Sequence, residues 1–194
     1  MDIWFTLGNS LIICGRSNSG KTTWVKKLIE HRDVLFKEKI QKIYWFYSTW
    51  QKEYENLKND VIFKNGIDDD EIQNNNMEAN SMLVLDDLVM EMENNHSITA
   101  LFTKYMHHKS LFLIYVSQNF YHQSREAHMR HLNSHFIVFF KNPWDKTQLS
   151  ILARQMFPGR SSHEFSIMFE KVTEKPHGYL LIDLRQEMPA EIHL

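Results

Sequence analysis

The chain has 194 residues, and its 22 Lys and Arg against 24 Asp and Glu give a formal net charge of −2 at pH 7. That balance excludes a polycation that coats nucleic acid by bulk charge alone, although it allows a local basic patch. Apolar residues make up 43% and aromatic residues 13% of the chain, which excludes global disorder and suits a packed core. We therefore expect a single domain over residues 1–194.

Short apolar runs alternate with helical patterns along the chain. The runs read as strands because they alternate little and are bounded by Gly or polar residues, at 10–14, 40–47, 82–85, 111–116, 136–140 and 178–184. Helical spacing of apolar residues occurs at 21–31, 98–106, 145–157 and 165–172. Such an alternation predicts an α/β fold, with a mostly parallel sheet covered by helices on both faces. Residues 66–80 are acidic, rich in Asn and without periodicity, so we expect a mobile loop there.

The segment between the first strand and the first helix matches the phosphate-loop pattern G-x-x-x-x-G-K-[ST] with Gly15, Arg16, Ser17, Asn18, Ser19, Gly20, Lys21 and Thr22. Glycines let backbone N–H groups close around a phosphate, and the helix N-terminus adds a positive dipole end. Lys21 would reach the terminal phosphates, Thr22 would hold Mg²⁺, and Thr23 would extend the nucleotide contacts. The pattern predicts a P-loop NTPase of the RecA/ASCE type that binds ATP and Mg²⁺. The alternative is a glycine turn before an ordinary helix.

Two carboxylates follow the apolar run 82–85, namely Asp86 and Asp87. In P-loop NTPases an Asp at such a strand end holds Mg²⁺. We assign that role to Asp86 and expect Asp87 to polarise the attacking water. A helix N-cap or a strand-end turn is the other interpretation, because Asp is common in both.

A polar residue ends the strand at 111–116 as well. Ligands of open parallel sheets bind at the carboxyl ends of strands, so we expect Gln118 to sense the γ-phosphate or to orient water. Asn119 is the second choice for this role, and a plain polar turn is the alternative interpretation. A sensor strand must lie between the two nucleotide-binding strands. This predicts the strand order 136–140, 10–14, 111–116, 82–85, 40–47.

The second half of the chain carries a further set of motifs. In order they are Leu101-Phe102-Thr103-Lys104, His107-His108, Ser117-Gln118-Asn119, Leu132-Asn133-Ser134-His135-Phe136, Phe140-Lys141-Asn142-Pro143 and Leu152-Ala153-Arg154-Gln155. With the phosphate loop and the acidic pair, the chain resembles the poxvirus-type genome-packaging ATPases of double-stranded DNA viruses and polinton-like elements, within the FtsK–HerA superfamily. The Lys-Asn-Pro and Leu-Ala-Arg-Gln pieces are the more specific ones. Trp144 departs from the family, whose members usually have Arg there, and Asp87 replaces the commoner Glu.

The resemblance implies a ring-forming motor, a pentamer or hexamer, that hydrolyses ATP to push double-stranded DNA into a capsid. It places the sensor on Gln118, the magnesium acid on Asp86 and the catalytic acid on Asp87. A capsid or portal-vertex protein would be a partner, no membrane would be involved, and the protein would act in the cytoplasm or nucleus of a host cell or with the virion. A ring ATPase needs a positive charge from its neighbour, and the candidates are Arg125, Arg130 and Arg154.

DNA contact would be to backbone phosphates, because a packaging motor must accept any sequence. Lys104, His107, His108 and Lys109 form one basic cluster, and Lys141 and Lys146 form another. A solvated surface explains such clusters equally well. Two other functions stay open: a small P-loop phosphotransferase such as a nucleotide kinase, and a non-catalytic nucleotide-dependent switch that assembles on a capsid.

Overall fold

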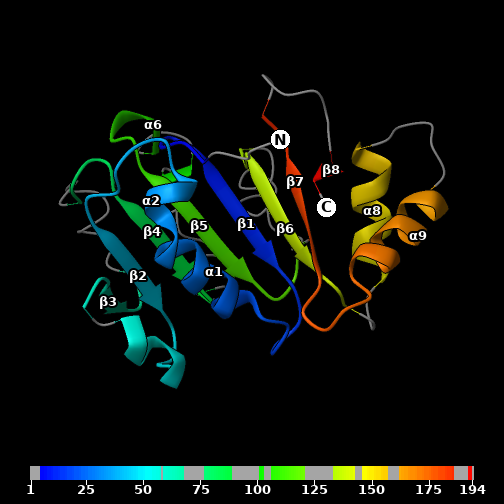
Figure 1. Ribbon diagram of the computed structural model, residues 1–194, viewed down its shortest axis with the longest axis horizontal. Helices are drawn as coiled ribbons and strands as arrows, with labels where there is room; N and C mark the ends of the chain where they lie inside the picture. Colours follow the sequence, from blue (N-terminus) through cyan, green and yellow to red (C-terminus); the bar gives the residue numbers. More distant parts are fainter. Residues whose placement is uncertain are drawn as a thin grey trace.

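The computed structural model describes residues 5–57, 59–67, 77–88, 101–102, 106–120, 133–142, 146–156, 162–185 and 192–193. Their strands form one eight-stranded sheet in the order β3-β2-β4-β5-β1-β6-β7-β8 (Figure 1). The strands are β1 (Ser10–Cys14), β2 (Ile43–Tyr47), β3 (Ile62–Asn65), β4 (Met82–Asp86), β5 (Phe112–Ser117), β6 (Phe136–Phe140), β7 (Tyr179–Asp183) and β8 (Ile192–His193).

The strands from β3 to β6 in this sheet run parallel, and β7 and β8 add an antiparallel edge. The predicted order of the five central strands is confirmed: β2, β4, β5, β1 and β6 are neighbours in that order. Every residue of β1, β4, β5 and β6 is buried, as expected for apolar strands covered on both faces. Registers such as Cys14↔Ser117 and Asp86↔Val116 align the carboxyl ends of β1, β4 and β5 at one edge.

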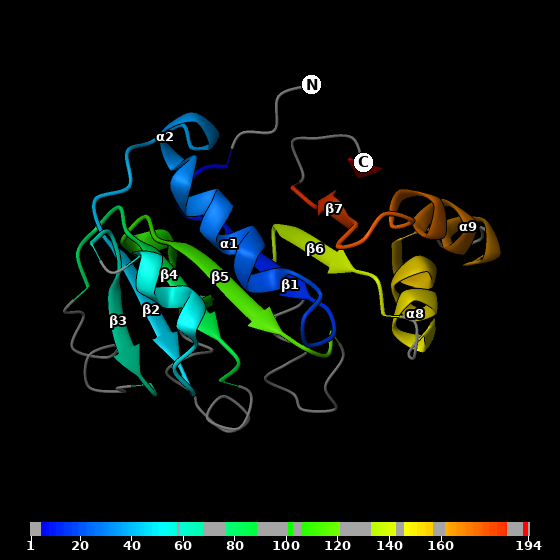
Figure 2. The ribbon, with the colours of Figure 1, turned by 60° about the horizontal axis from the view of Figure 1, so that its bottom comes forward.

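Helices pack against both faces of the sheet; Figures 1 and 2 show α1 over its central strands and α8 and α9 together beside β6 and β7. On one face α1 (Lys21–Glu30) buries Val25, Leu28 and Ile29 against the sheet, beside α2 (Arg32–Leu35) and the short 3₁₀ helix η1 (Lys52–Leu57). On the other face α8 (Lys146–Met156) and α9 (Ser162–Val172) pack apolar side chains against the sheet. The short helix α6 (Met106–His108) precedes β5. These elements confirm the α/β prediction.

Several elements differ from the sequence-based expectation. The parallel strand β3 and the short strand β8 were not predicted, and η1 fills a segment that carried no prediction. Most of the predicted helix 98–106 and most of the predicted loop 66–80 lie outside the described residues. In the part of the chain that the structure describes, no helix is long and apolar enough to cross a membrane.

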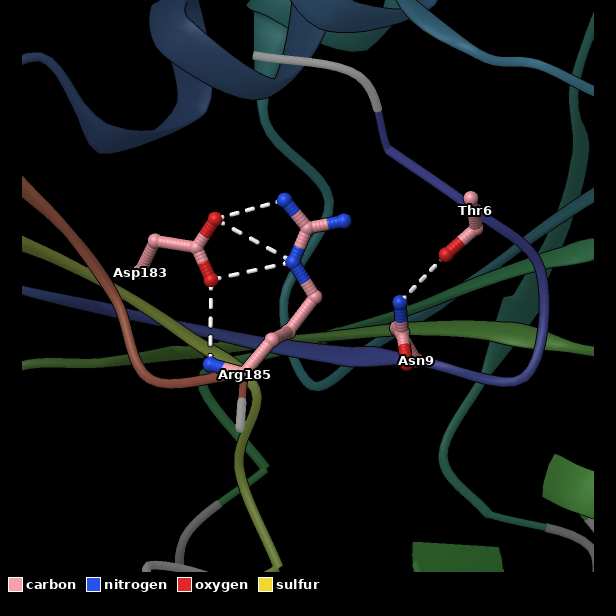
Figure 3. Close-up of polar contacts among 4 residues, drawn as sticks. All are labelled: Thr6, Asn9, Asp183 and Arg185. Atoms are coloured by element: carbon pink, nitrogen blue, oxygen red, sulfur yellow. Dashed lines mark hydrogen bonds and ion pairs between the residues drawn. The ribbon is translucent and has the colours of Figure 1, made fainter. Parts of the chain in front are cut away.

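The antiparallel edge ends in a partly buried ion pair. Asp183, 3% exposed, accepts hydrogen bonds from the Arg185 side chain, with Nη2–Oδ2 at 2.6 Å and Nε–Oδ1 at 3.0 Å (Figure 3). The Arg185 guanidinium also lies 4.7 Å from the centroid of the Phe136 ring on β6. At the start of β1, the Asn9 side chain donates to the hydroxyl of Thr6 (Figure 3). The Arg185 side chain thus contacts both the end of β7 and a ring of β6.

Candidate nucleotide-binding site

The loop from Gly15 to Thr22 turns between β1 and α1 and leaves the start of the helix open. Gly20 precedes α1 with φ 107°, no side chain caps the helix, and no acidic residue lies in its first turn. Asn18 also has a positive φ of 62°, which Asn adopts more easily than most residues. The first N–H groups of α1 therefore lack the usual side-chain acceptor, which is the arrangement that binds an anion.

Close packing explains the first glycine of the loop. A Cβ atom at Gly15 would lie 2.6 Å from Cβ of Phe140 and 2.9 Å from Oγ of Ser19. The backbone of Gly15 is also tied to β5, since its N–H donates to the Ser117 carbonyl at 3.3 Å. The loop is thus seated on β5 and β6 in a space that only glycine fits.

Lys21 folds back over the loop. Its Nζ donates to the carbonyl oxygens of Gly15 at 2.6 Å and Arg16 at 2.9 Å. Burial lowers the pKa of Lys21, while the charges of Asp86 and Asp87 act in the opposite direction. The lysine and the two carboxylates therefore interact electrostatically.

Asp86 ends β4 and is 3% exposed. Its Oδ2 accepts a hydrogen bond from the Tyr54 hydroxyl at 2.7 Å. Burial raises the pKa of Asp86 and the Asp87 charge raises it further, whereas the Tyr54 hydrogen bond and the Lys21 charge oppose the rise. A carboxylate in this setting is stabilised by any additional cation that reaches it.

Asp87 and Gln118 meet across neighbouring strand ends. Asp87 has φ 55°, and its N–H donates to the Val116 carbonyl of β5 at 3.3 Å. The Gln118 amide Nε2 lies 3.4 Å from both carboxylate oxygens of Asp87. Asn119, the second choice for the sensor, is engaged elsewhere, because its Oδ1 lies 3.5 Å from the Nε2 donor of Gln148.

One pocket of about 520 Å³ brings most of the predicted residues together. Its predicted lining residues are Ser17, Asn18, Gly20, Lys21, Thr22, Thr23, Asp86, Asp87 and Gln118. Gly15, Arg16 and Ser19 belong to the loop but do not line the pocket. A hydroxyl, an ammonium group, two carboxylates and an amide thus converge on a cavity that opens at the carboxyl ends of β1, β4 and β5.

Five lining residues were not predicted, among them Val116 and Ser117 at the end of β5. Gln51 and Glu53 come from the segment that enters η1, and His177 comes from the turn between α9 and β7. The His177 Nδ1 lies 2.9 Å from the Ser19 carbonyl; since a carbonyl only accepts, Nδ1 carries the proton. His177 has φ 61°, a conformation that non-glycine residues seldom adopt, and Pro176 and Gly178 on either side of it are the local signals of this turn.

The described residues of the arginine candidates and basic clusters do not line the pocket, although Lys141 follows β6 and lines a small cavity beside Asn18 and Ser19 of the loop. Arg154 is exposed on α8, where its Nε donates to the Ser150 carbonyl at 3.3 Å, and it does not line the pocket. Arg125 and Arg130 lie outside the described residues. In the first basic cluster, Lys109 precedes β5, at the end opposite to the pocket, and donates to the Met77 carbonyl at 2.6 Å.

The fold and the phosphate loop define the class of protein: a P-loop NTPase fold. No protein-family model matches the chain, and no curated protein matches its sequence. The solved DNA-packaging ATPase B204 of Sulfolobus turreted icosahedral virus is similar over 98% of both chains, with a TM-score of 0.62 and 12% identity. The genome-packaging NTPase B204 of Sulfolobus turreted icosahedral virus 2 in complex with sulfate has a TM-score of 0.64 and 15% identity over 100% of this chain and 98% of that one.

The same B204 protein in complex with AMPPCP is similar as well, with a TM-score of 0.64 and 14% identity over 96% of this chain and 97% of that chain. At these identities the likeness shows the fold alone. The likeness extends along nearly the whole chain.

Proposed function

We propose that this protein is an ATP-hydrolysing motor that moves double-stranded DNA into a viral capsid. The observation that carries the ATPase part is the convergence of Lys21, Thr22, Asp86, Asp87 and Gln118 on one pocket beside an uncapped helix start. The packaging part is supported by the similarity in fold to the B204 proteins, which are named as packaging enzymes, and by the motif resemblance.

The chain's own residues would divide the chemistry among them. The loop N–H groups and Lys21 would bind the phosphates and stabilise charge as the terminal phosphoryl group is displaced. Asp87 would accept the proton of the attacking water. The Gln118 amide, 3.4 Å from the Asp87 oxygens, would hold that carboxylate in place and contact the phosphate.

Residues at the start of α1 and at the end of β4 fit Mg²⁺. The pocket lining combines the Thr22 hydroxyl with the Asp86 carboxylate, and oxygen ligands of this kind are those that Mg²⁺ takes. Burial of Asp86 also leaves a carboxylate whose charged form benefits from a cation. Bound Mg²⁺ would supply positive charge at the phosphate oxygens, and Thr22 and Asp86 would hold it.

A second cavity continues from the phosphate pocket and would receive the rest of the nucleotide. It measures about 900 Å³ and shares Gly20, Thr23 and His177 with the phosphate pocket. Aromatic side chains of α1 and β7, Trp24 and Tyr179, line it with ring centroids 6.0 Å apart. Rings of this kind suit a flat base, because base–aromatic stacking tolerates many bases.

Ring assembly and DNA contact are further parts of the proposal. Arg154 and Arg130 are the candidates for the charge that a neighbouring subunit would supply, and the exposure of Arg154 leaves its guanidinium available to a neighbour. DNA would be gripped through its phosphates, so binding would fall steeply with salt and ignore sequence. A capsid or portal-vertex protein would be the other partner.

The test is an ATPase assay on the purified chain with and without double-stranded DNA. We expect phosphate release that depends on Mg²⁺. DNA of any sequence should stimulate it, and this stimulation should weaken as the salt concentration rises. The Lys21→Ala variant should release no phosphate. Lys39, which is exposed in the connection between α2 and β2, offers a control for the lost charge in Lys39→Ala.

Two outcomes would replace the proposal. Phosphate transfer to a nucleoside monophosphate without DNA stimulation would indicate a phosphotransferase. Nucleotide binding without hydrolysis, with packaging activity unchanged in Lys21→Ala, would indicate an assembly switch.

A further inference from the structure

Tyr54 makes a buried contact with the carboxylate that the proposed function assigns to Mg²⁺. The Tyr54 side chain is 0% exposed, and its hydroxyl donates to Oδ2 of Asp86 at 2.7 Å. Burial raises the pKa of the Tyr54 phenol, and the Asp86 charge and the hydrogen bond to Asp86 raise it further. The phenol therefore keeps its proton and acts as a donor to Asp86.

An aromatic cluster fixes the Tyr54 ring. Its centroid lies 5.0 Å from Trp45, 5.7 Å from Tyr47, 5.3 Å from Trp50 and 5.2 Å from Phe63, with the Phe63 ring stacked at 19°. Trp45 and Tyr47 belong to β2 and Phe63 belongs to β3, so two strands of the sheet contribute to the cluster. With so many ring contacts, the hydroxyl has little freedom to leave Asp86.

The segment that carries Tyr54 also forms one wall of the phosphate pocket. Gln51 and Glu53 line the pocket, and the Glu53 carbonyl accepts a hydrogen bond from Lys26 of α1 at 3.0 Å. Strand β2 lies directly beside β4, with Tyr47 opposite Asp86. After β2 the chain therefore passes the pocket and then places the Tyr54 hydroxyl against Asp86 of β4, the strand beside β2.

We infer that Tyr54 is a positioning residue that orients Asp86 toward the metal of a bound nucleotide. The hydrogen bond engages one carboxylate oxygen, Oδ2, and so sets the plane of the carboxylate and the direction of the other oxygen. Groups that hydrogen-bond a metal ligand in this way typically matter 10–100-fold for metal affinity or activity. The inference rests on the proposed function, because it requires that Asp86 serve Mg²⁺.

The test measures how strongly Mg²⁺ strengthens nucleotide binding, without any turnover. A fluorescent ADP analogue is titrated into the protein in EDTA and again in excess Mg²⁺, and the ratio of the two dissociation constants gives the coupling to the metal. We expect Tyr54→Phe to lower this ratio about tenfold while leaving the affinity in EDTA unchanged. The matched control is Tyr47→Phe, which removes a hydroxyl from the same cluster and should leave both affinities unchanged.

A double variant separates positioning from general structure. Asp86→Asn should already lower the ratio, and adding Tyr54→Phe to it should change nothing more, because Tyr54 acts through Asp86. The inference is overturned if Tyr54→Phe keeps the wild-type ratio, if it weakens binding in EDTA, or if its effect simply adds to that of Asp86→Asn. A wild-type protein that binds no nucleotide overturns the proposed function itself, which distinguishes the two failures.

Discussion

The close packing of Gly15 gives a prediction whose size can be worked from the structure. A Cβ in Gly15→Ala would lie 2.6 Å from Cβ of Phe140. Ordinary carbon contacts are ~3.5–4 Å, so the atoms overlap by about 1 Å. Phe140 is 2% exposed on a strand paired on both sides, so the loop must move instead. Overpacking of this kind costs about 2 kcal/mol, within a range of ~1–3.

Both stability and binding should respond to this substitution. For a chain of this size about 2 kcal/mol corresponds to a fall in Tm of ~4–8 °C, measured by differential scanning calorimetry. A shift of ~1 Å in the loop should lower kcat/KM for ATP on the order of 100-fold, because binding groups that are misplaced by that distance lose most of their effect.

The control is Ser17→Ala, a change at an exposed side chain of the same loop that introduces no overlap. We expect its Tm to match that of the wild type. If Gly15→Ala kept both the wild-type Tm and the wild-type kcat/KM, the loop would not be seated on Phe140 and the reasoning would be refuted.

Two further predictions concern Asp87, which we propose as the catalytic base, and the edge of the sheet. Asp87→Asn should keep nucleotide affinity, measured by titration with an ADP analogue, and should lower the rate of phosphate release by ~10²–10⁴-fold. Hydrolysis at the wild-type rate would mean that another carboxylate, such as Glu53 in the pocket lining, acts as the base. Asp183→Asn should lower Tm by ~4–8 °C, because it weakens charge-assisted hydrogen bonds from Arg185 that are worth about 2 kcal/mol. Nucleotide affinity should not change in Asp183→Asn, and an unaltered Tm would mean that the ion pair contributes nothing to stability.

The central sheet could be predicted because its signals are local. Each buried parallel strand is a continuous apolar run, and the nucleotide chemistry required the 111–116 strand to lie between the two that carry the phosphate loop and the acidic pair. The edges gave weaker signals. Strand β3 is short, contains Lys64 and Asn65, and has exposed ends, so its sequence does not differ from that of a loop. The 178–184 run was expected as a strand, but its antiparallel pairing with β6 was not, because an apolar run carries no signal of strand direction.

The pocket residues also fall into a group that the sequence indicates and a group that it does not. Lys21, Asp86 and Gln118 each sit at the end of an apolar run or in a fixed pattern, and parallel pairing of neighbouring strands brings such ends together without further information. Tyr54 has no such signal, because Lys52-Glu53-Tyr54-Glu55 reads as a charged surface segment. Its burial depends on rings contributed by β2 and β3.

Tyr54 and His177 share one structural property that explains both omissions. Each lies in a connection outside the predicted strands, and each reaches the site across a long sequence separation, to Asp86 in one case and to the Ser19 carbonyl in the other. Parallel strand order determines which strand ends meet, but it does not determine where the connections fold back. In this protein the phosphate loop and the strand ends therefore supply the groups predicted to act on the nucleotide, while other connections supply contacts that hold these groups and the loop, and only the three-dimensional structure reveals the second set.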